Sequence, residues 1–221
     1  NFSNFLELSF DQNSFEKIVF LNKHSLLFIL RIMAILASLF NIFTFSKCKT
    51  SENSLFKYLQ IMSTVDLLYC SLLTIFAIAT YFYSLEPNSQ CLQYLNSFIY
   101  IYISEYLTSC LAFYNILMEI YLTLKRLLLI SNQDKFINRI KSKHINLAIF
   151  AFSFTIYIPM LFAHKTELIL LNGQLTYFTI KSKFGQSELI KYLINSIKFM
   201  RIFLVTVLLF VLNLMAIYKY R

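Results

Sequence analysis

Five long runs of apolar residues alternate with short polar segments along the chain of 221 residues. Apolar runs of about 18 or more residues are typical of membrane-spanning helices and too long for most core helices of soluble domains. The pattern therefore predicts an all-α membrane protein, a bundle of five transmembrane helices over residues 25–221, preceded by a mixed segment at residues 1–24. We expect the helices at about residues 25–45, 55–83, 92–130, 145–162 and 197–218.

The longest polar connection, residues 163–196, carries a different pattern. Two β-prone stretches, Leu168–Leu171 and Leu175–Ile180, flank the dipeptide Asn172-Gly173. Asn-Gly between such stretches is a strong short-range signal for a hairpin. We therefore expect a β-hairpin between the fourth and fifth helices.

The composition supports a membrane protein and narrows the chemistry. Hydrophobic residues make up 58% of the chain and charged residues 14%, with two Gly, two Pro and a mean hydropathy of +0.62. A soluble domain has about 45–50% apolar and about 25% charged residues. Intrinsic disorder, collagen and a disulfide-stapled miniprotein are excluded, and two glycines leave no room for a glycine-rich phosphate loop.

The net charge of +9 is distributed unevenly between the polar connections. If all five runs cross a membrane, one side carries eleven basic residues against two acidic ones, and the other carries seven against six. Basic residues in short loops mark the cytoplasmic side, so we expect the N-terminus outside and no role in binding nucleic acid. The eleven basic residues are Lys47, Lys49, Lys57, Lys125, Arg126, Lys135, Arg139, Lys141, Lys143, Lys219 and Arg221.

Three carboxylates fall inside the apolar runs, namely Asp66, Glu105 and Glu119. A carboxylate in the bilayer costs several kcal/mol unless it is paired, hydrated or protonated. One interpretation is an ion site, a proton relay or a counter-ion for a ligand. The other is a helix-packing network with partners such as Arg31, Asn41, Asn115 or Arg201.

Catalytic motifs are missing from the sequence. The three His are far apart, the four Cys show neither a CxxC pair nor the Cys/His spacing of a metal site, and no HExxH or GxSxG motif occurs. We therefore expect that the protein is not an enzyme and has no catalytic residues, cofactor or metal centre, apart from the sodium ion discussed next.

Four features now form a familiar order. The first run contains Asn41, the second reads LFKYLQIMSTVDLL and reaches Asp66, the third ends in TLKRLLLI with Arg126, and the fourth contains Pro159. This order resembles rhodopsin-like G-protein-coupled receptors, whose first four helices carry an Asn, an Asp, an Asp-Arg-Tyr segment and often a Pro. The resemblance covers about residues 25–221, five of the family's seven helices, and implies two further apolar segments after Arg221.

The resemblance implies roles for individual residues. Asp66 would hold a sodium ion and its waters together with Asn115, which lies about three helical turns before Arg126. Arg126 and Lys125 would contact a heterotrimeric G protein, while Asn41 would brace the second helix and Pro159 would have a structural role. The ligand pocket would use residues near the outer end of the third helix, for which we expect Glu105, Tyr106, Thr108, Ser109 and Phe113.

The sequence also departs from the family pattern. Lys125 replaces the acid that normally precedes the Arg, Leu127 replaces the Tyr, and Phe152 stands where the family has a Trp. The fifth run lacks the usual Pro. Cys91 lies about ten residues too far from Arg126, and no Cys follows Cys110, so the family's disulfide to the outer loop cannot form.

Two functions from different classes follow. The first is a receptor for a neuropeptide or chemosensory ligand, either a peptide or a small molecule, that signals across the plasma membrane. The alternative is a structural or proton-handling subunit of a larger complex, for example in an organelle inner membrane, where partner subunits would cover the intramembrane acids. A membrane-embedded enzyme is the weakest interpretation because no nucleophile or metal constellation supports it.

Overall fold

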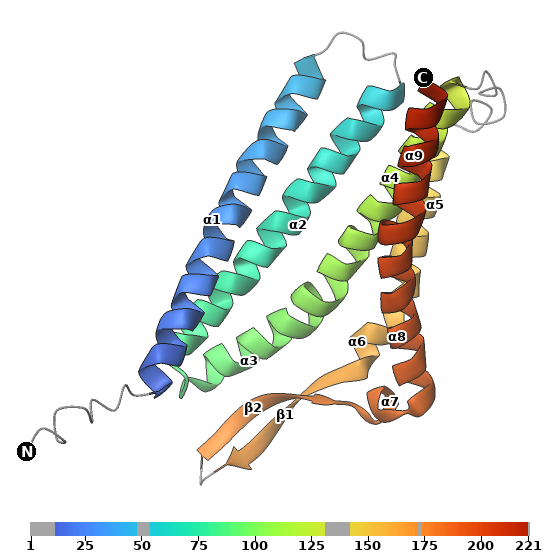
Figure 1. The fold of residues 1–221 in the computed structure, drawn as a ribbon. Coiled ribbons are helices and arrows are strands. Elements are labelled where there is room, and N and C mark those ends of the chain that lie inside the picture. Colours follow the sequence, from blue (N-terminus) through green and yellow to red (C-terminus); the bar gives the residue numbers. More distant parts are fainter. Residues whose placement is uncertain (1–11, 48–53, 131–141, 172–173, 221) are drawn as a thin grey trace, which may run out of the picture.

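The computed structural model describes residues 12–47, 54–130, 142–171 and 174–220 (Figure 1). Long helices dominate this part of the chain, together with two strands and four short helical segments, η2, α6, α7 and η4. The elements are α1 (Gln12–Lys47), α2 (Ser54–Leu85), α3 (Gln90–Ile99), the π-helix η2 (Tyr100–Leu107), α4 (Thr108–Ile130), α5 (Ser142–Ile156), α6 (Ile158–Ala163), β1 (His164–Leu171), β2 (Gln174–Lys181), α7 (Lys183–Gln186), α8 (Glu188–Phe203), the π-helix η4 (Leu204–Leu208) and α9 (Leu209–Tyr220).

Five helical stretches of the described chain are long and apolar enough to cross a membrane, which confirms the predicted number. They are Leu27–Lys47, Phe56–Leu85, Gln90–Leu129, Lys143–Ala163 and Glu188–Lys219. The protein is therefore an integral membrane protein with a helical bundle.

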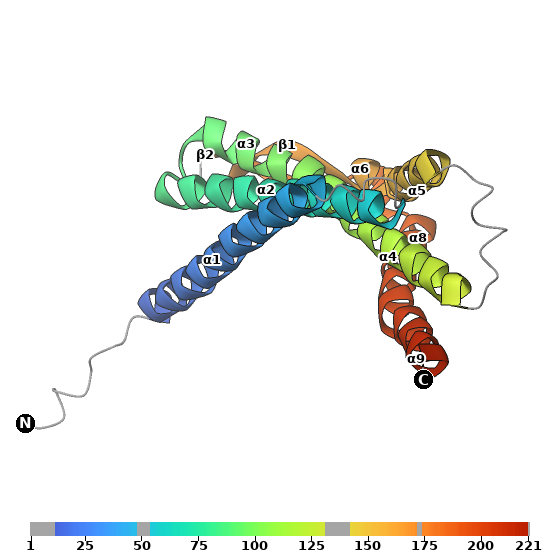
Figure 2. The ribbon, with the colours of Figure 1, turned by 90° about the horizontal axis from the view of Figure 1, so that it is seen from above.

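The third stretch is the centre of this bundle. In its most apolar window, 50% of the residues are buried, against 6–17% in the other four helices. Its α4 segment packs against α2, α5 and α9, whereas α1 packs mainly on α2 and lies at the edge of the bundle (Figure 2). This stretch is helical throughout its 40 residues, with the π-helix η2 in the middle.

The fifth helix begins earlier than the sequence pattern predicted. We expected its start at residue 197, but α8 begins at Glu188, directly after Ser187. Ile190 and Ile197, two helical turns apart, are both buried, whereas Leu189 and Tyr192 are exposed. The prediction was wrong because the first two turns of α8 are apolar on one narrow face only. A search for a continuous run of apolar residues does not detect such a face. As a result, Lys198 and Arg201 lie inside the helix and not at its edge.

Proline divides the fourth helix into two segments. Pro159 occupies the first turn of α6, and α5 ends at Ile156, with Tyr157 between them at φ −92° and ψ −3°. Proline has no N–H for the helical ladder and its ring clashes with the preceding turn. The resulting break turns the Tyr157 and Met160 side chains toward α4 and α8, where both are buried.

The segment after α6 folds back onto the end of that helix. Strands β1 and β2 pair antiparallel, from His164 with Lys181 to Leu171 with Gln174; the Asn172-Gly173 turn lies outside the described residues. At the end of β2, the Ser182 N–H donates to the Ala163 carbonyl (3.0 Å) and its hydroxyl donates to Phe162. Gly185 then approaches the Ala163 carbonyl so closely that a Cβ at this position would lie 2.1 Å from its oxygen.

Candidate functional site

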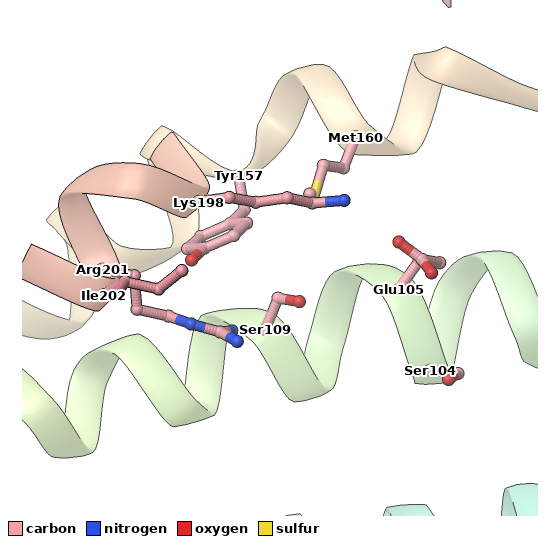
Figure 3. Close-up of a pocket in the computed structure, with 8 residues that line it drawn as sticks. All are labelled: Ser104, Glu105, Ser109, Tyr157, Met160, Lys198, Arg201 and Ile202. Atoms are coloured by element: carbon pink, nitrogen blue, oxygen red, sulfur yellow. The ribbon is translucent and has the colours of Figure 1, made fainter. Parts of the chain in front are cut away.

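A cavity of about 280 Å³ lies between the third, fourth and fifth membrane helices (Figure 3). Four elements line it: η2, α4, α8 and the kinked region around α6. Most of the lining side chains are polar or charged, although the surrounding helices are apolar. The lining residues are Ser104, Glu105, Ser109, Tyr157, Met160, Lys198, Arg201 and Ile202.

The π-helix η2 positions the acidic side of the cavity. A π-helix pairs residues five apart, and such segments are rare and frequent at functional sites. The Tyr100 hydroxyl donates to the Glu105 carboxylate over 3.0 Å, a contact between residues five apart. The π turn therefore brings a phenol beside the carboxylate and holds it at the cavity wall.

The basic side of the cavity comes from α8. Lys198 and Arg201 are three residues apart and therefore share one helix face. Figure 3 shows both side chains extending from α8 toward the helix that carries Glu105 and Ser109. Arg201 lies thirteen residues after Glu188, about 20 Å along the helix axis. The two cations are therefore far from the polar end of their helix.

The third wall is formed by Tyr157 and Met160 at the kink made by Pro159. Tyr157 is 1% exposed, and its ring packs edge-on against Phe113. Its hydroxyl is buried beside the Arg201 guanidinium, and the hydroxyl proton has no acceptor among the described residues. A buried donor without an acceptor is uncommon, and this one belongs to the cavity lining.

The cavity therefore combines one carboxylate and two cations in a largely apolar bundle. Among the described residues, the ion pairs are Lys165–Glu167 and Lys191–Glu188. Glu105 is thus not within ion-pair distance of Lys198 or Arg201, and all three charges line the same space. Such a site suits a small ligand with charged and hydrogen-bonding groups better than an apolar one.

Two of the five predicted pocket residues, Glu105 and Ser109, line this cavity, because residues four apart share a helix face. The other three have different places in the structure. Phe113 is fully buried in a cluster with Cys110, the Tyr106 hydroxyl donates to the Phe154 carbonyl over 3.3 Å, and the Thr108 hydroxyl donates to the carbonyl of Ser104 in its own helix. None of the three lines the cavity, and all three are buried or packed against the core.

Asp66 and Asn115 meet between α2 and α4. The Asn115 side-chain amide donates to the Asp66 carboxylate over 2.5 Å, and the Asn115 amide oxygen is buried with no hydrogen-bond partner among the described residues. Glu119, one turn further along α4, is close enough to act electrostatically on Asp66. Both carboxylates are exposed in the described part of the chain. The role that the sequence suggested for this pair, a sodium site, stays a prediction.

The other predicted residues divide between surface and core. Arg126 is exposed, whereas Lys125 is 7% exposed and its ammonium group lies 5.2 Å from the centre of the Tyr58 ring. Arg126 is therefore the accessible residue for a contact with a partner, and Lys125 acts in packing. Pro159 has the structural role that was expected of a helix proline, since it ends α5 and starts α6.

Asn41 is exposed in the described structure, and its bracing role stays a prediction. Ser38 is buried on the same helix, and Arg31 and Ile42 are partly buried. Asn41 precedes Ile42 by one residue and is therefore about 100° around the helix from it. A hydrogen bond between α1 and α2 comes from the Arg31 guanidinium, which donates to the Leu73 carbonyl over 3.1 Å.

Sequence reasoning missed Tyr157, Lys198 and Arg201 as cavity residues. For the two cations a signal existed, because charges inside an apolar helix are costly and usually functional. Arg201 was considered only as a packing partner for a carboxylate, and Lys198 lies at the expected start of the fifth helix, where a charge is not costly. No family model and no curated protein matches the chain.

Proposed function

We propose that the protein is a membrane receptor of the rhodopsin-like type, whose ligand binds in the cavity between the third, fourth and fifth helices. In this proposal the N-terminus and the connection formed by β1 and β2 lie outside the plasma membrane, and Arg126 contacts a G protein inside. The observation that carries the proposal is the charged cavity itself. Ionisable residues inside a membrane bundle mark functional sites by default.

One helix links the cavity to the opposite end of the bundle. Ser109 lines the cavity near the start of α4, and Arg126 is exposed near its end. Seventeen residues of helix span about 25 Å. Between the two lies Asn115, whose contact with Asp66 joins α4 to α2. A ligand that moves α4 relative to α2 would therefore change a polar contact on the way to Arg126, as a two-state helix packing requires.

The Asp66–Asn115 pair also fits a small cation. The Asp66 carboxylate and the unfilled oxygen of Asn115 are oxygen ligands, the type that hard cations prefer. A sodium ion there would stabilise one packing of α2 and α4. This supports a regulatory role for the pair and is tested by salt substitution, as described in the Discussion.

The decisive test is nucleotide exchange. The full-length protein is expressed in membranes with each class of heterotrimeric G protein, and binding of a non-hydrolysable GTP analogue is measured with peptide and amino-acid extracts as probes. We expect exchange above that of membranes without the protein, and loss of this excess in Arg126→Ala at equal surface expression. Lys47→Ala, a change of another exposed basic residue at the end of α1, is the matched control. No exchange with any G-protein class would refute the receptor function.

A second function is favoured by a separate observation. Asp66 and Glu119 are exposed on helices that are apolar enough to span a membrane, and uncovered carboxylates in lipid are costly. A subunit of a larger membrane complex would have these faces covered by partner chains. Under this alternative the protein purifies in mild detergent with stoichiometric partners, whereas a receptor purifies without them.

A further inference from the structure

We propose that the cavity binds a zwitterion of amino-acid size, whose carboxylate is held by Lys198 and Arg201 and whose ammonium group is held by Glu105. This rests on the proposed function for the existence of a ligand, and it adds the chemistry of that ligand. The arrangement of the three charges, the size of the cavity and the buried Tyr157 hydroxyl carry the inference.

The two signs of charge lie on opposite walls. Lys198 and Arg201 come from α8, and Glu105 comes from η2, across the space seen in Figure 3. No ion pair joins Glu105 to either cation among the described residues, so a molecule between them meets both signs. Two cations with several N–H donors are typical of carboxylate recognition. A single carboxylate already held by the Tyr100 hydroxyl suits one ammonium group.

The volume of the cavity matches a small molecule. A water molecule in the liquid occupies about 30 Å³, so a cavity of about 280 Å³ holds a ligand of roughly ten non-hydrogen atoms. This is the size of one amino acid. A longer peptide would enter with one residue only, the remainder lying outside the cavity.

Tyr157 supplies a second observation that points to a ligand. Its hydroxyl is buried beside Arg201, a group that can only donate, and its proton has no acceptor among the described residues, while the ring packs against Phe113. Leaving a buried donor without an acceptor is costly. A carboxylate oxygen bound to Arg201 would accept from this hydroxyl and remove that cost.

Two kinds of ligand carry both a carboxylate and an ammonium group, the pair that this cavity requires. A free amino acid carries a carboxylate and an ammonium group, and the C-terminal lysine of a peptide carries a carboxylate and a side-chain ammonium. Both would place the carboxylate at Lys198 and Arg201. The experiment therefore uses the standard free L-amino acids as one set of probes, and the peptide Ala-Ala-Lys with its C-terminal amide as the other.

Binding is measured by isothermal titration calorimetry with the full chain in lipid nanodiscs. We expect saturable binding of at least one zwitterion, and loss of binding when its carboxylate is converted to an amide. If only free amino acids bind, the source is a free amino acid; if the peptide binds and its amide does not, the source is a peptide terminus. No binding by any of these probes, or equal binding of acid and amide, overturns the proposal.

Substitutions of the three charged cavity residues test which side chain holds which charged group of the ligand. Lys198→Met, Arg201→Met and Glu105→Gln should each weaken binding about 10- to 100-fold, the range for loss of a hydrogen bond to a charged group. Lys191→Met is the matched control on α8, since Lys191 pairs with Glu188 and does not line the cavity. Unchanged affinity in the three cavity variants overturns the charge assignment.

Tyr157→Phe keeps the test decisive if a charge variant fails to fold. This change removes one oxygen and leaves the ring packing intact, so we expect binding to weaken several-fold with no loss of thermal stability. Equal affinity in this variant removes the argument from the buried hydroxyl.

The outcome is independent of signalling. Zwitterion binding without nucleotide exchange would uphold this inference and refute the receptor function. Nucleotide exchange that is driven by a ligand without a carboxylate, and that Lys198→Met does not change, would uphold the receptor function and refute the zwitterion inference.

Discussion

Replacing Gly185 with alanine should force α7 away from the end of α6. The new Cβ would lie 2.1 Å from the Ala163 carbonyl oxygen and 2.8 Å from its carbon, whereas Cβ atoms essentially never approach a neighbour within 3.0 Å. The clashing atoms belong to the backbone and cannot rotate away. The contact can therefore relax only if α7 and α6 separate, which stretches the hydrogen bonds from Ser182 to Ala163 and Phe162.

The size of the effect follows from two costs and one gain in stability. Overpacking costs about 1–3 kcal/mol, and stretching a hydrogen bond forfeits about 0.5–1.5 kcal/mol. Alanine in a helix is favoured over glycine by about 0.5–1 kcal/mol, and this gain is small in the short helix α7. We therefore expect a net loss of about 1–3 kcal/mol, a decrease of Tm by about 2–10 °C in a chain of this size.

Thermal unfolding of the purified protein in detergent, followed by helical circular dichroism, measures this loss. Ser187→Ala is the matched control, because Ser187 is exposed two residues further and makes no cap hydrogen bond with its side chain; its Tm should not change measurably. An equal or higher Tm for Gly185→Ala would refute the close approach of α7 to α6.

Three further predictions concern the rest of the bundle. In a double-mutant cycle, Asp66→Ala and Asn115→Ala should show a coupling of about 0.6–1.7 kcal/mol in unfolding free energy, the range for interhelical hydrogen bonds in membranes; additivity would contradict the contact. Replacing potassium with sodium should raise the Tm of the wild type but not of Asp66→Asn, and an equal response of both would argue against a sodium site. In intact cells that express a Cys48→Ser variant, an impermeant maleimide should label exposed Cys91 from outside, and labelling only after permeabilisation would reverse the proposed orientation.

The pattern of apolar runs predicted the membrane class and the number of spanning helices because both depend on segment length and composition. Five helices of sufficient length and apolarity are present in the described chain. The kink at Pro159 was equally accessible from the sequence, since proline disrupts a helix wherever it stands in the interior. These features are local, and no knowledge of neighbouring helices is needed to infer them.

Helix faces and packing partners were harder to infer. The pairing of Asp66 with Asn115 followed from a family resemblance, and the structure brings the two side chains together. The same resemblance placed Asn41 against α2 and Phe113 in the pocket. In the structure, Asn41 is exposed and Phe113 is a core residue. A rotation of about 100° separates the right face from the wrong one, and short motifs do not determine it.

The cavity was decided by tertiary structure alone. Its charges come from helices separated by more than ninety residues, Glu105 on η2 and Arg201 on α8. A π segment and a proline kink turn Glu105 and Tyr157 toward the same space. The sequence determines which segments enter the membrane, because the free energy of transferring a segment from water into lipid is a sum over the residues of that segment. Which polar groups meet inside it depends on how the helices rotate and pack, and only the folded chain specifies that.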